Sequence, residues 1–406
     1  MRLRPELLIA LGLASLDARA ADLDLRLKAF GSHAMLPDED IQRASEGTPA
    51  QDGSVDARAM FAQQTGGWRW IAELDTVYQV GDSYGFNNAP QGTLDQTPSD
   101  DDSRFMDLTW TLDDGDRHRV YQRLDRLALS YRGANWGVTV GRQAVSWGSG
   151  LVFQPLDLFS PFAPTTVDRD YKPGDDVVMF DRLNDNETDL QLLAVLRRDA
   201  QGNRDAAETS VGGKFHALWG ERDLDFVVGR HYRDAVFGVS LRMPVGTALL
   251  RTDWLVTDLE EGGTKVSGIV NLDYSFDWMG KSWYVFAEYF RNGFGVSREP
   301  VDITRLPSAL TTRLARGELF TLMKDYTALG MQIQWHPLIM HSLSVITNLH
   351  DTSSLLQTSV SYDAGDAMRY EAGVVAPLGA PGDEYGGVEA TAVRARRTCV
   401  HHGGCD

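Results

Sequence analysis

Cysteine and histidine side chains that could bind a metal or form a disulfide stand together near the end of the sequence. Cys399 and Cys405 enclose His401 and His402 in the pattern C-x-H-H-x-x-C. Zinc sites use such ligands, but there is no second paired motif here to complete one. Two nearby cysteines in an oxidising compartment most simply form a disulfide. We expect a small disulfide loop between them, with no metal and no other cofactor.

A serine nucleophile is the other chemistry to consider. Ser149 stands between two glycines, but the spacing G-x-S-x-G of a nucleophile elbow is absent around it. His341 and Ser342 are adjacent, so on a strand their side chains would point to opposite faces. Neither arrangement makes a catalytic triad. The sequence therefore predicts a protein that is not an enzyme, with a lipid-hydrolysing enzyme as the less favoured alternative.

Many of the charged residues occur in segments where every second side chain is apolar. In 247–256 one set of alternate residues is mostly apolar and ends in Val256, while the other set includes Arg251 and Asp253. In 269–278 the apolar set ends in Trp278, and the other set includes Asp273. Successive side chains of a strand point to opposite faces, so each segment has one face suited to lipid and one suited to water. This pattern is typical of a transmembrane β-barrel.

Segments of this kind recur along the whole chain. The predicted strands lie near 23–32, 55–64, 68–80, 119–131, 135–143, 175–183, 188–198, 209–220, 223–233, 235–243, 247–257, 267–278, 282–292, 325–336, 339–350, 353–363, 368–376 and 385–394. Their number is eighteen, which is even as bacterial barrels require, and sixteen is the alternative. Residues 105–112 also alternate, but we interpret them as a hairpin arm within the loop 81–118.

The breaks between these segments are short and long in turn. Those after even-numbered strands have a few residues, whereas 33–54, 81–118, 144–174 and 293–324 follow odd-numbered strands. Short periplasmic turns and long extracellular loops have this asymmetry. The fold class that follows is all-β, a single antiparallel transmembrane barrel with both termini in the periplasm.

The N-terminal residues indicate export. Arg2 and Arg4 precede an apolar run at 7–16 and a small-x-small site at 18–20, as in a secretory signal peptide, although an uncleaved helix is an alternative. We expect a signal peptide at 1–20, the barrel at 21–394 and a periplasmic tail at 395–406. After residue 20 no apolar run reaches the length of a membrane helix. The net charge of −18 disfavours nucleic acid as a partner.

Tryptophan is concentrated near the short breaks. Seven of the ten tryptophans lie within a few residues of them: Trp68, Trp70, Trp136, Trp219, Trp278, Trp283 and Trp335. An indole ring prefers the lipid–water interface, where the ring is buried and the N–H stays hydrated. We predict that these seven residues form the periplasmic aromatic girdle.

The loop 144–174 has the composition of an ordered loop. It contains four prolines and aromatic side chains that are unsuited to water. We expect it to fold into the lumen and narrow the pore, while a closed lid and packing on the rim are alternatives. Its candidate constriction residues are Trp147, Phe153, Asp157, Phe159, Phe162, Asp168, Arg169, Asp170 and Lys172.

Charged residues on the predicted wet faces are candidates to line the lumen. They are Arg69, Glu73, Asp75, Lys214, His216, Arg242, Arg251, Asp253, Asp273 and Glu288. Such residues either produce a field that orients passing solutes or pair with one another as the packing of a filled lumen. An eighteen-stranded barrel is wide enough for an aqueous path unless loops fill it.

A family resemblance rests on one run of sequence. The run from about Arg123 (RLDRLALSYRG) to residue 176, which ends in GRQAVSWGSGLVFQPLDLFSPFAPTTVDRDYKPGDD, resembles a set of Gram-negative outer-membrane barrels that are porin-like or similar to alginate-export channels. The resemblance implies a fold and a location in the outer membrane more than a substrate. The expected function is a channel for passive or selective passage of small solutes. A scaffold barrel that sheathes a secretion or electron-transfer component is the alternative, and an outer-membrane hydrolase is less favoured. Expected partners are outer-membrane lipid, lipopolysaccharide, the barrel assembly machinery and small solutes.

Overall fold

The protein was analysed as a computed structural model that describes residues 21–35, 49–85, 101–164, 166, 171–184, 188–199, 201–297, 306–380, 383–385 and 392–401. The predicted signal peptide at 1–20 lies outside these residues, as do Asp168, Arg169, Asp170 and Cys405. The disulfide and the charges at the end of the constriction loop therefore stay predictions.

The described residues form nineteen strands in one antiparallel sheet. They are β1 Ala21–Ala34, β2 Ala50–Thr65, β3 Trp68–Gly81, β4 Thr109–Asp114, β5 His118–Arg132, β6 Trp136–Gln143, β7 Asp175–Leu183, β8 Thr188–Val195, β9 Ser210–Trp219, β10 Arg222–His231, β11 Asp234–Val245, β12 Ala248–Asp258, β13 Thr264–Trp278, β14 Lys281–Arg291, β15 Asp325–His336, β16 Ile339–Asn348, β17 Ser354–Asp363, β18 Met368–Leu378 and β19 Ala392–His401.

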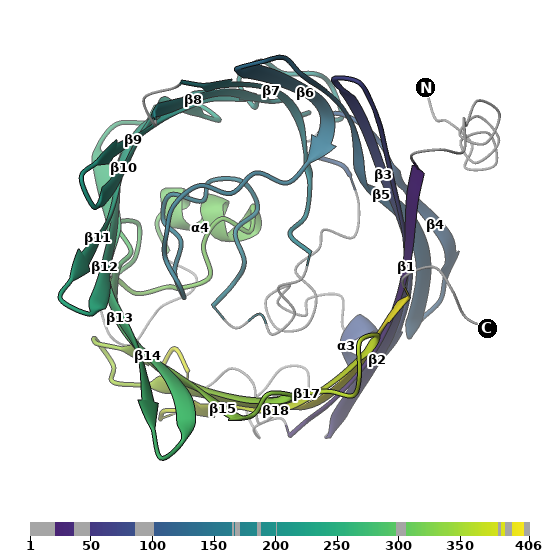
Figure 1. Cartoon of the computed structure of the whole chain (residues 1–406), viewed down its shortest axis with the longest axis vertical. Helices are drawn as coiled ribbons and strands as arrows, with labels where there is room; N and C mark the ends of the chain where they lie inside the picture. The colour runs from purple at the N-terminus through teal and green to yellow at the C-terminus, as the bar shows by residue number, and fades with distance from the viewer. Residues whose placement is uncertain are drawn as a thin grey trace.

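The sheet closes on itself as a barrel (Figure 1). Each strand pairs with the next in the chain, except that β3 pairs with β5, and β19 returns to pair with β1 in the register Leu25 to His401. The short strand β4 pairs with residues 119–123 of β5, on the edge of β5 that pairs with β6 at residues 127–132, so the ring closes without it. Eighteen strands therefore make the barrel, as the alternation predicted, and β4 is the predicted hairpin arm.

The alternating apolar and polar side chains of the sequence point to the outside and the inside of the barrel. On β13, Val270, Leu272 and Tyr274 are 41%, 47% and 37% exposed on the outside, whereas Asn271 and Asp273 between them are buried inside. An apolar exterior and a polar interior are what a bilayer requires of a barrel strand. The hydrophobic stripes of the sequence are thus explained by an outer surface rather than by a core between two sheets.

One β-bulge changes which side chains point inward on β5. Opposite Glu73 of β3 the register shifts between Arg126 and Leu124, so Asp125 is the additional residue. An additional residue allows two neighbouring side chains to point to the same side of a sheet. Asp125 and Arg126 are both buried in the interior network described below, and Leu127 follows on the other face.

The last strand lies seven residues later than predicted. It was expected at 385–394 and occupies Ala392–His401, so the predicted tail at 395–406 begins inside a strand and Cys399 pairs in register with Leu27 and Met368. The reason lies in Glu384 and Tyr385, whose backbone N–H groups donate to Asp351 and Ser353. These contacts hold residues 383–385 against the neighbouring strands, so the chain forms β19 only after them.

Long connections fill part of the barrel. The connections β6–β7 and β14–β15, the second of which carries helix α4 Ser308–Ala315, run inside the ring of strands (Figure 1). The other helix, α3 Asp82–Gly85, directly follows β3. Neither helix of the described residues has the length and apolar character needed to cross a bilayer. These two connections shape the interior of the barrel.

Candidate functional site

Two carboxylates of the barrel wall hold the tip of the loop 144–174. The N–H groups of Leu151, Val152 and Phe153 donate to the Glu288 carboxylate over 3.0, 3.2 and 2.8 Å. The N–H and the hydroxyl of Ser149 both donate to Asp253 over 2.7 Å. We call Asp253 and Glu288 the anchor carboxylates. Both were predicted to line the lumen, and their contacts fix the loop inside it.

Aromatic side chains attach the same loop to two sides of the wall. The Trp147 indole N–H donates to Gln191 of β8 over 2.7 Å, and its ring meets Phe159 edge-on at 5.1 Å between centroids. Phe153 stacks on Phe290 of β14 with centroids 4.3 Å apart. All three loop rings are less than 5% exposed, so they are removed from water by the wall. The inward position of the loop agrees with the prediction, and rim packing does not describe it.

A buried ion pair holds the two arms of the loop together. The Lys172 Nζ lies 2.5 Å from both Asp157 oxygens, 3.0 Å from the Ser146 hydroxyl, and contacts the Val145 carbonyl. Burial raises the pKa of Asp157 to about 6 although the ammonium of Lys172 opposes the rise.

Phe162, another predicted constriction residue, is half-buried further along the loop.

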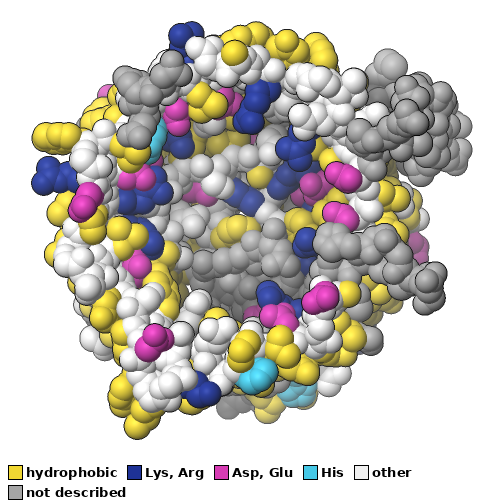
Figure 2. All heavy atoms as spheres, viewed as in Figure 1, with side chains coloured by type: hydrophobic (Ala, Val, Ile, Leu, Met, Phe, Trp, Pro, Cys, Tyr) yellow, Lys and Arg dark blue, Asp and Glu magenta, His cyan; other side chains and the backbone are white. Residues whose placement is uncertain are grey.

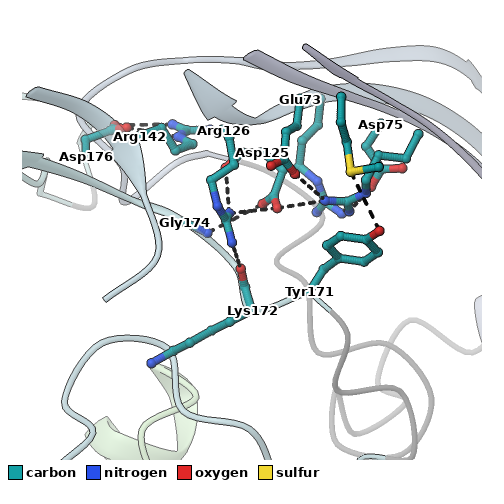
Figure 3. Close-up of polar contacts among 12 residues, drawn as sticks. Glu73, Asp75, Asp125, Arg126, Arg142, Tyr171, Lys172, Gly174 and Asp176 are labelled. Atoms are coloured by element: carbon teal, nitrogen blue, oxygen red, sulfur yellow. Dashed lines mark hydrogen bonds and ion pairs between the residues drawn. The ribbon is translucent and has the colours of Figure 1, made fainter. Parts of the chain in front are cut away.

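The loop returns to the wall beside a network of buried charges on β2, β3 and β5 (Figure 3). Arg58 contacts Asp75, Asp125 and Glu73 at 3.0, 3.2 and 3.3 Å, and Arg126 contacts Asp125 at 2.8 Å. Arg126 also donates to the Lys172 carbonyl. The network therefore joins the barrel wall to the end of the constriction loop, while the Lys172 side chain points away from the wall (Figure 3).

A second network lies beside the first, on β6, β7 and the outer connection that precedes β4. Arg142, which is fully buried, contacts Asp176 and Asp101 at 2.9 Å each, and Arg104 contacts Asp101 at the same distance. The two arginines hold the pKa of Asp101 below its usual range. Because unpaired buried charges are costly, these pairs specify one position for the loop ends.

A second inward connection, between β14 and β15, was not predicted as a constriction. Helix α4 contributes Arg313, which contacts Asp234 at 2.5 Å and lies over the Phe294 ring at 3.9 Å. Glu318 follows the helix and lies 3.2 Å from His231. Its sequence has no aromatic, proline-rich run like that of 144–174, and its partners are distant in the chain. Local sequence therefore gave little sign that it folds inward.

A third inward contact comes from the connection between β18 and β19. Glu384 accepts hydrogen bonds from the Tyr326 hydroxyl, the Leu322 N–H and the Asn348 amide over 2.6, 2.7 and 2.8 Å. Burial raises the pKa of Glu384 to about 7, against these donors. Tyr385 packs on the apolar cluster around Tyr326. This contact was also missed, because 385–394 was interpreted as a strand.

The other predicted lumen residues mostly pair across strands. His216 lies 3.2 Å from Asp223 and 2.9 Å from Asp225, Arg242 lies 2.7 Å from Asp223, and Arg251 lies 2.9 Å from Asp273. Arg69 and Lys214 are on the same inward faces. Charged side chains of both signs gather around the central hollow in Figure 2. Of the two interpretations offered by the sequence, mutual pairing describes most of these residues.

One group in the described part of the chain has donor atoms close enough to hold a metal ion. The donor atoms of His216, Asp223 and Asp225 lie within 4.8 Å of one another. The Arg242 guanidinium, 2.7 Å from Asp223, already supplies a positive charge there. A cation would have to displace it, so the donor set does not favour a resident metal.

The predicted girdle tryptophans lie at one edge of the barrel, close to the short turns. Trp68, Trp70, Trp219, Trp278 and Trp335 are 45–69% exposed, and Trp136 is 38% exposed. Trp283 lies between Trp278 and Trp335, with ring centroids 5.3 and 6.4 Å away. Exposed indoles in such a band match an interface between lipid and water.

A closed eighteen-stranded barrel with a folded loop across its lumen is the architecture of outer-membrane porins. Among solved structures, the chain is similar to OccK5 (OpdH) of Pseudomonas aeruginosa, with a TM-score of 0.55, 9% identity, and 94% and 99% of the two chains covered. It is similar to OccAB1 of Acinetobacter baumannii, with a TM-score of 0.54, 9% identity and coverage of 95% and 99%. It is also similar to the outer membrane protein opdK of Pseudomonas aeruginosa, with a TM-score of 0.53, 11% identity, and 94% and 98% of the two chains covered. No protein-family model matches the chain, and no curated protein matches it. At these identities the similarity establishes the porin fold.

Proposed function

We propose that this protein is an outer-membrane channel of a Gram-negative bacterium, through which small solutes pass by diffusion along a lumen narrowed by the loop 144–174. The observation that carries the proposal is the fixed position of that loop. Asp253 and Glu288 of the wall hold its tip at residues 149–153, and Trp147 and Phe153 contact separate parts of the wall, on β8 and β14. A loop that is fixed across a lumen sets which solutes pass.

The outer surface supports a place in a membrane. Its apolar side chains are exposed on strand after strand, for example Val228, Phe237 and Leu329 at 63%, 50% and 58%. Such exposure is costly in water and favourable in hydrocarbon. The partners that follow are outer-membrane lipid, lipopolysaccharide at the outer edge, the barrel assembly machinery and the permeating solutes. The predicted signal peptide at 1–20 is part of the same proposal.

The alternatives receive less support. A scaffold barrel would need an unobstructed interior, but three connections of this barrel fold inward. A hydrolase would need a base beside Ser149, whose hydroxyl instead donates to Asp253 and accepts from Ser240. Both serine contacts serve to hold the loop.

Conductance across a planar bilayer tests the proposal. We expect the purified protein to conduct, and a variant with 151–164 replaced by a short Gly-Ser linker to conduct more. Replacing 201–207 in the outer connection β8–β9 by a linker is the matched control and should leave conductance unchanged. If the folded protein, identified by its heat-modifiable mobility on gels, conducts in neither form, the channel proposal is wrong.

A further inference from the structure

A recess lies between the constriction loop and the connection that carries α4. The recess has a cavity volume of about 60 Å³ and is open to solvent. The ring residues along it are Phe153, Phe162, Phe290, Phe294 and Phe320. Its wall residues belong to the outer ends of the five strands β10 to β14, so it is on the extracellular side of the anchor carboxylates. A solute entering from outside meets this recess before it meets the anchored loop tip.

Two rings of the recess remain accessible. Phe153, Phe290 and Phe294 are 3–5% exposed and pack on one another or on the wall. Phe162 and Phe320 are only half-buried, and within the described part of the chain neither has an aromatic partner. Phe162 on the constriction loop and Phe320 after α4 both line the recess, and half-buried phenyl rings offer an apolar surface for a small ligand.

Charge determines which ligand suits this surface. Each charged side chain on the described lining is already paired: Asp157 with Lys172, His231 with Glu318, and Arg313 with Asp234. A charged ligand would lose its hydration without gaining a free counter-charge. Thr257, Ser267 and Gln154 also line the recess and carry hydroxyl or amide groups for a neutral polar substituent.

From this lining we infer that the recess is a binding site for a neutral solute with one aromatic or apolar ring and a single hydrogen-bonding group. The cavity volume of about 60 Å³ is small, so a single ring fits the open recess better than a fused or oligomeric molecule. The inference rests on the proposed function, because it names the class of solute that the channel selects. Selection occurs between the two inward connections, before the narrowest part of the lumen.

Equilibrium binding to the detergent-solubilised protein, followed by saturation-transfer NMR and calorimetry, tests the inference. The probes are benzyl alcohol, the anion benzoate, the cation benzylammonium and the ringless neutral solute glycerol. Benzyl alcohol should bind, and the other three should bind at least about tenfold more weakly, since burial of an unpaired charge or loss of a ring contact costs 1.4 kcal/mol or more. Phe162→Ser and Phe320→Ser should each weaken benzyl alcohol binding about tenfold.

Leu112→Ser is the matched control, an apolar-to-hydroxyl change at a residue that is 53% exposed on β4 and does not line the recess. It should leave binding unchanged. Equal binding of benzoate and benzyl alcohol, or binding that survives both phenylalanine changes in folded protein, would overturn the inference. Conductance without benzyl alcohol binding rejects the inference and leaves the channel proposal standing. Binding without conductance rejects only the channel proposal.

Discussion

Single carboxylates determine where the inward connections lie. Glu288 accepts three consecutive backbone N–H groups and the Asn271 amide, and Glu384 accepts three hydrogen bonds from separate segments. A buried carboxylate is stable only with such partners, so each of these side chains restricts the chain around it to one arrangement. The two carboxylates affect the protein differently. The pKa of Glu384 is raised to about 7, so its contacts depend on pH, whereas Glu288 serves to position the loop.

The connection β18–β19 should loosen as pH rises. The pKa of Glu384 is raised to about 7 from 4.5, so its folded surroundings favour the protonated form. This contribution to stability is complete below about pH 4.5 and is lost as pH rises through 7. Current fluctuations of the open channel should therefore be larger at pH 8.5 than at pH 5.5 on the outer side. Glu384→Gln should remove this difference, and a pH dependence that persists in the variant would contradict the assignment.

At the scale of elements, the strands could be predicted from sequence and the inward connections only in part. Every strand of the ring except β19 is located by its own alternation, and the constriction loop by prolines and aromatics within 144–174. The partners of that loop could not be predicted, because Glu288 is 135 residues from Phe153 along the chain. The same holds for α4, where Arg313 meets Asp234 across 79 residues. The bulge at Asp125 leaves no local signal, since it depends on the register with β3.

The anchoring of the constriction loop can be weakened by one substitution. Glu288→Gln keeps the size of the side chain but replaces three charge-assisted hydrogen bonds with weaker ones or none. The expected loss is about 2–4 kcal/mol of loop stability. Single-channel recordings should then show a larger and more variable conductance than the parent protein.

The matched control is Asp277→Asn, which removes an exposed carboxylate on β13 close to a short turn and far from the loop. Its conductance should equal that of the parent. An unchanged conductance in Glu288→Gln would show that the anchor carboxylate does not hold the loop in place.

The whole molecule has two unlike edges. All connections at one edge of the barrel have two to four residues, and every long connection leaves the other edge, which also carries the two-residue turn between β10 and β11. The exposed tryptophans share the first edge with the short turns. Such a distribution defines an orientation in the membrane, with the short turns in the periplasm. The orientation could be predicted from loop lengths, because successive connections of an antiparallel barrel lie at opposite edges in turn.

Labelling of single cysteines in intact cells tests this orientation. Gly202 in the connection β8–β9 and Gly246 in the turn β11–β12 are matched positions, with φ of +78° and +64° and open space for an added side chain. In a Cys399→Ser, Cys405→Ser background, a membrane-impermeant maleimide should label Gly202→Cys and leave Gly246→Cys unlabelled. Disruption of the outer membrane should expose both. The reverse pattern in intact cells would require the opposite orientation.

The pairing of β19 with β1 has a consequence for crosslinking. The strand that seals the cylinder is made from the last described residues of the chain and meets the first ones, whereas the constriction loop and α4 belong to the middle. Asp253 of β12 and Glu288 of β14 hold the constriction loop, and neither strand borders this seam. A crosslink across the seam should therefore fix the closed cylinder without displacing the loop.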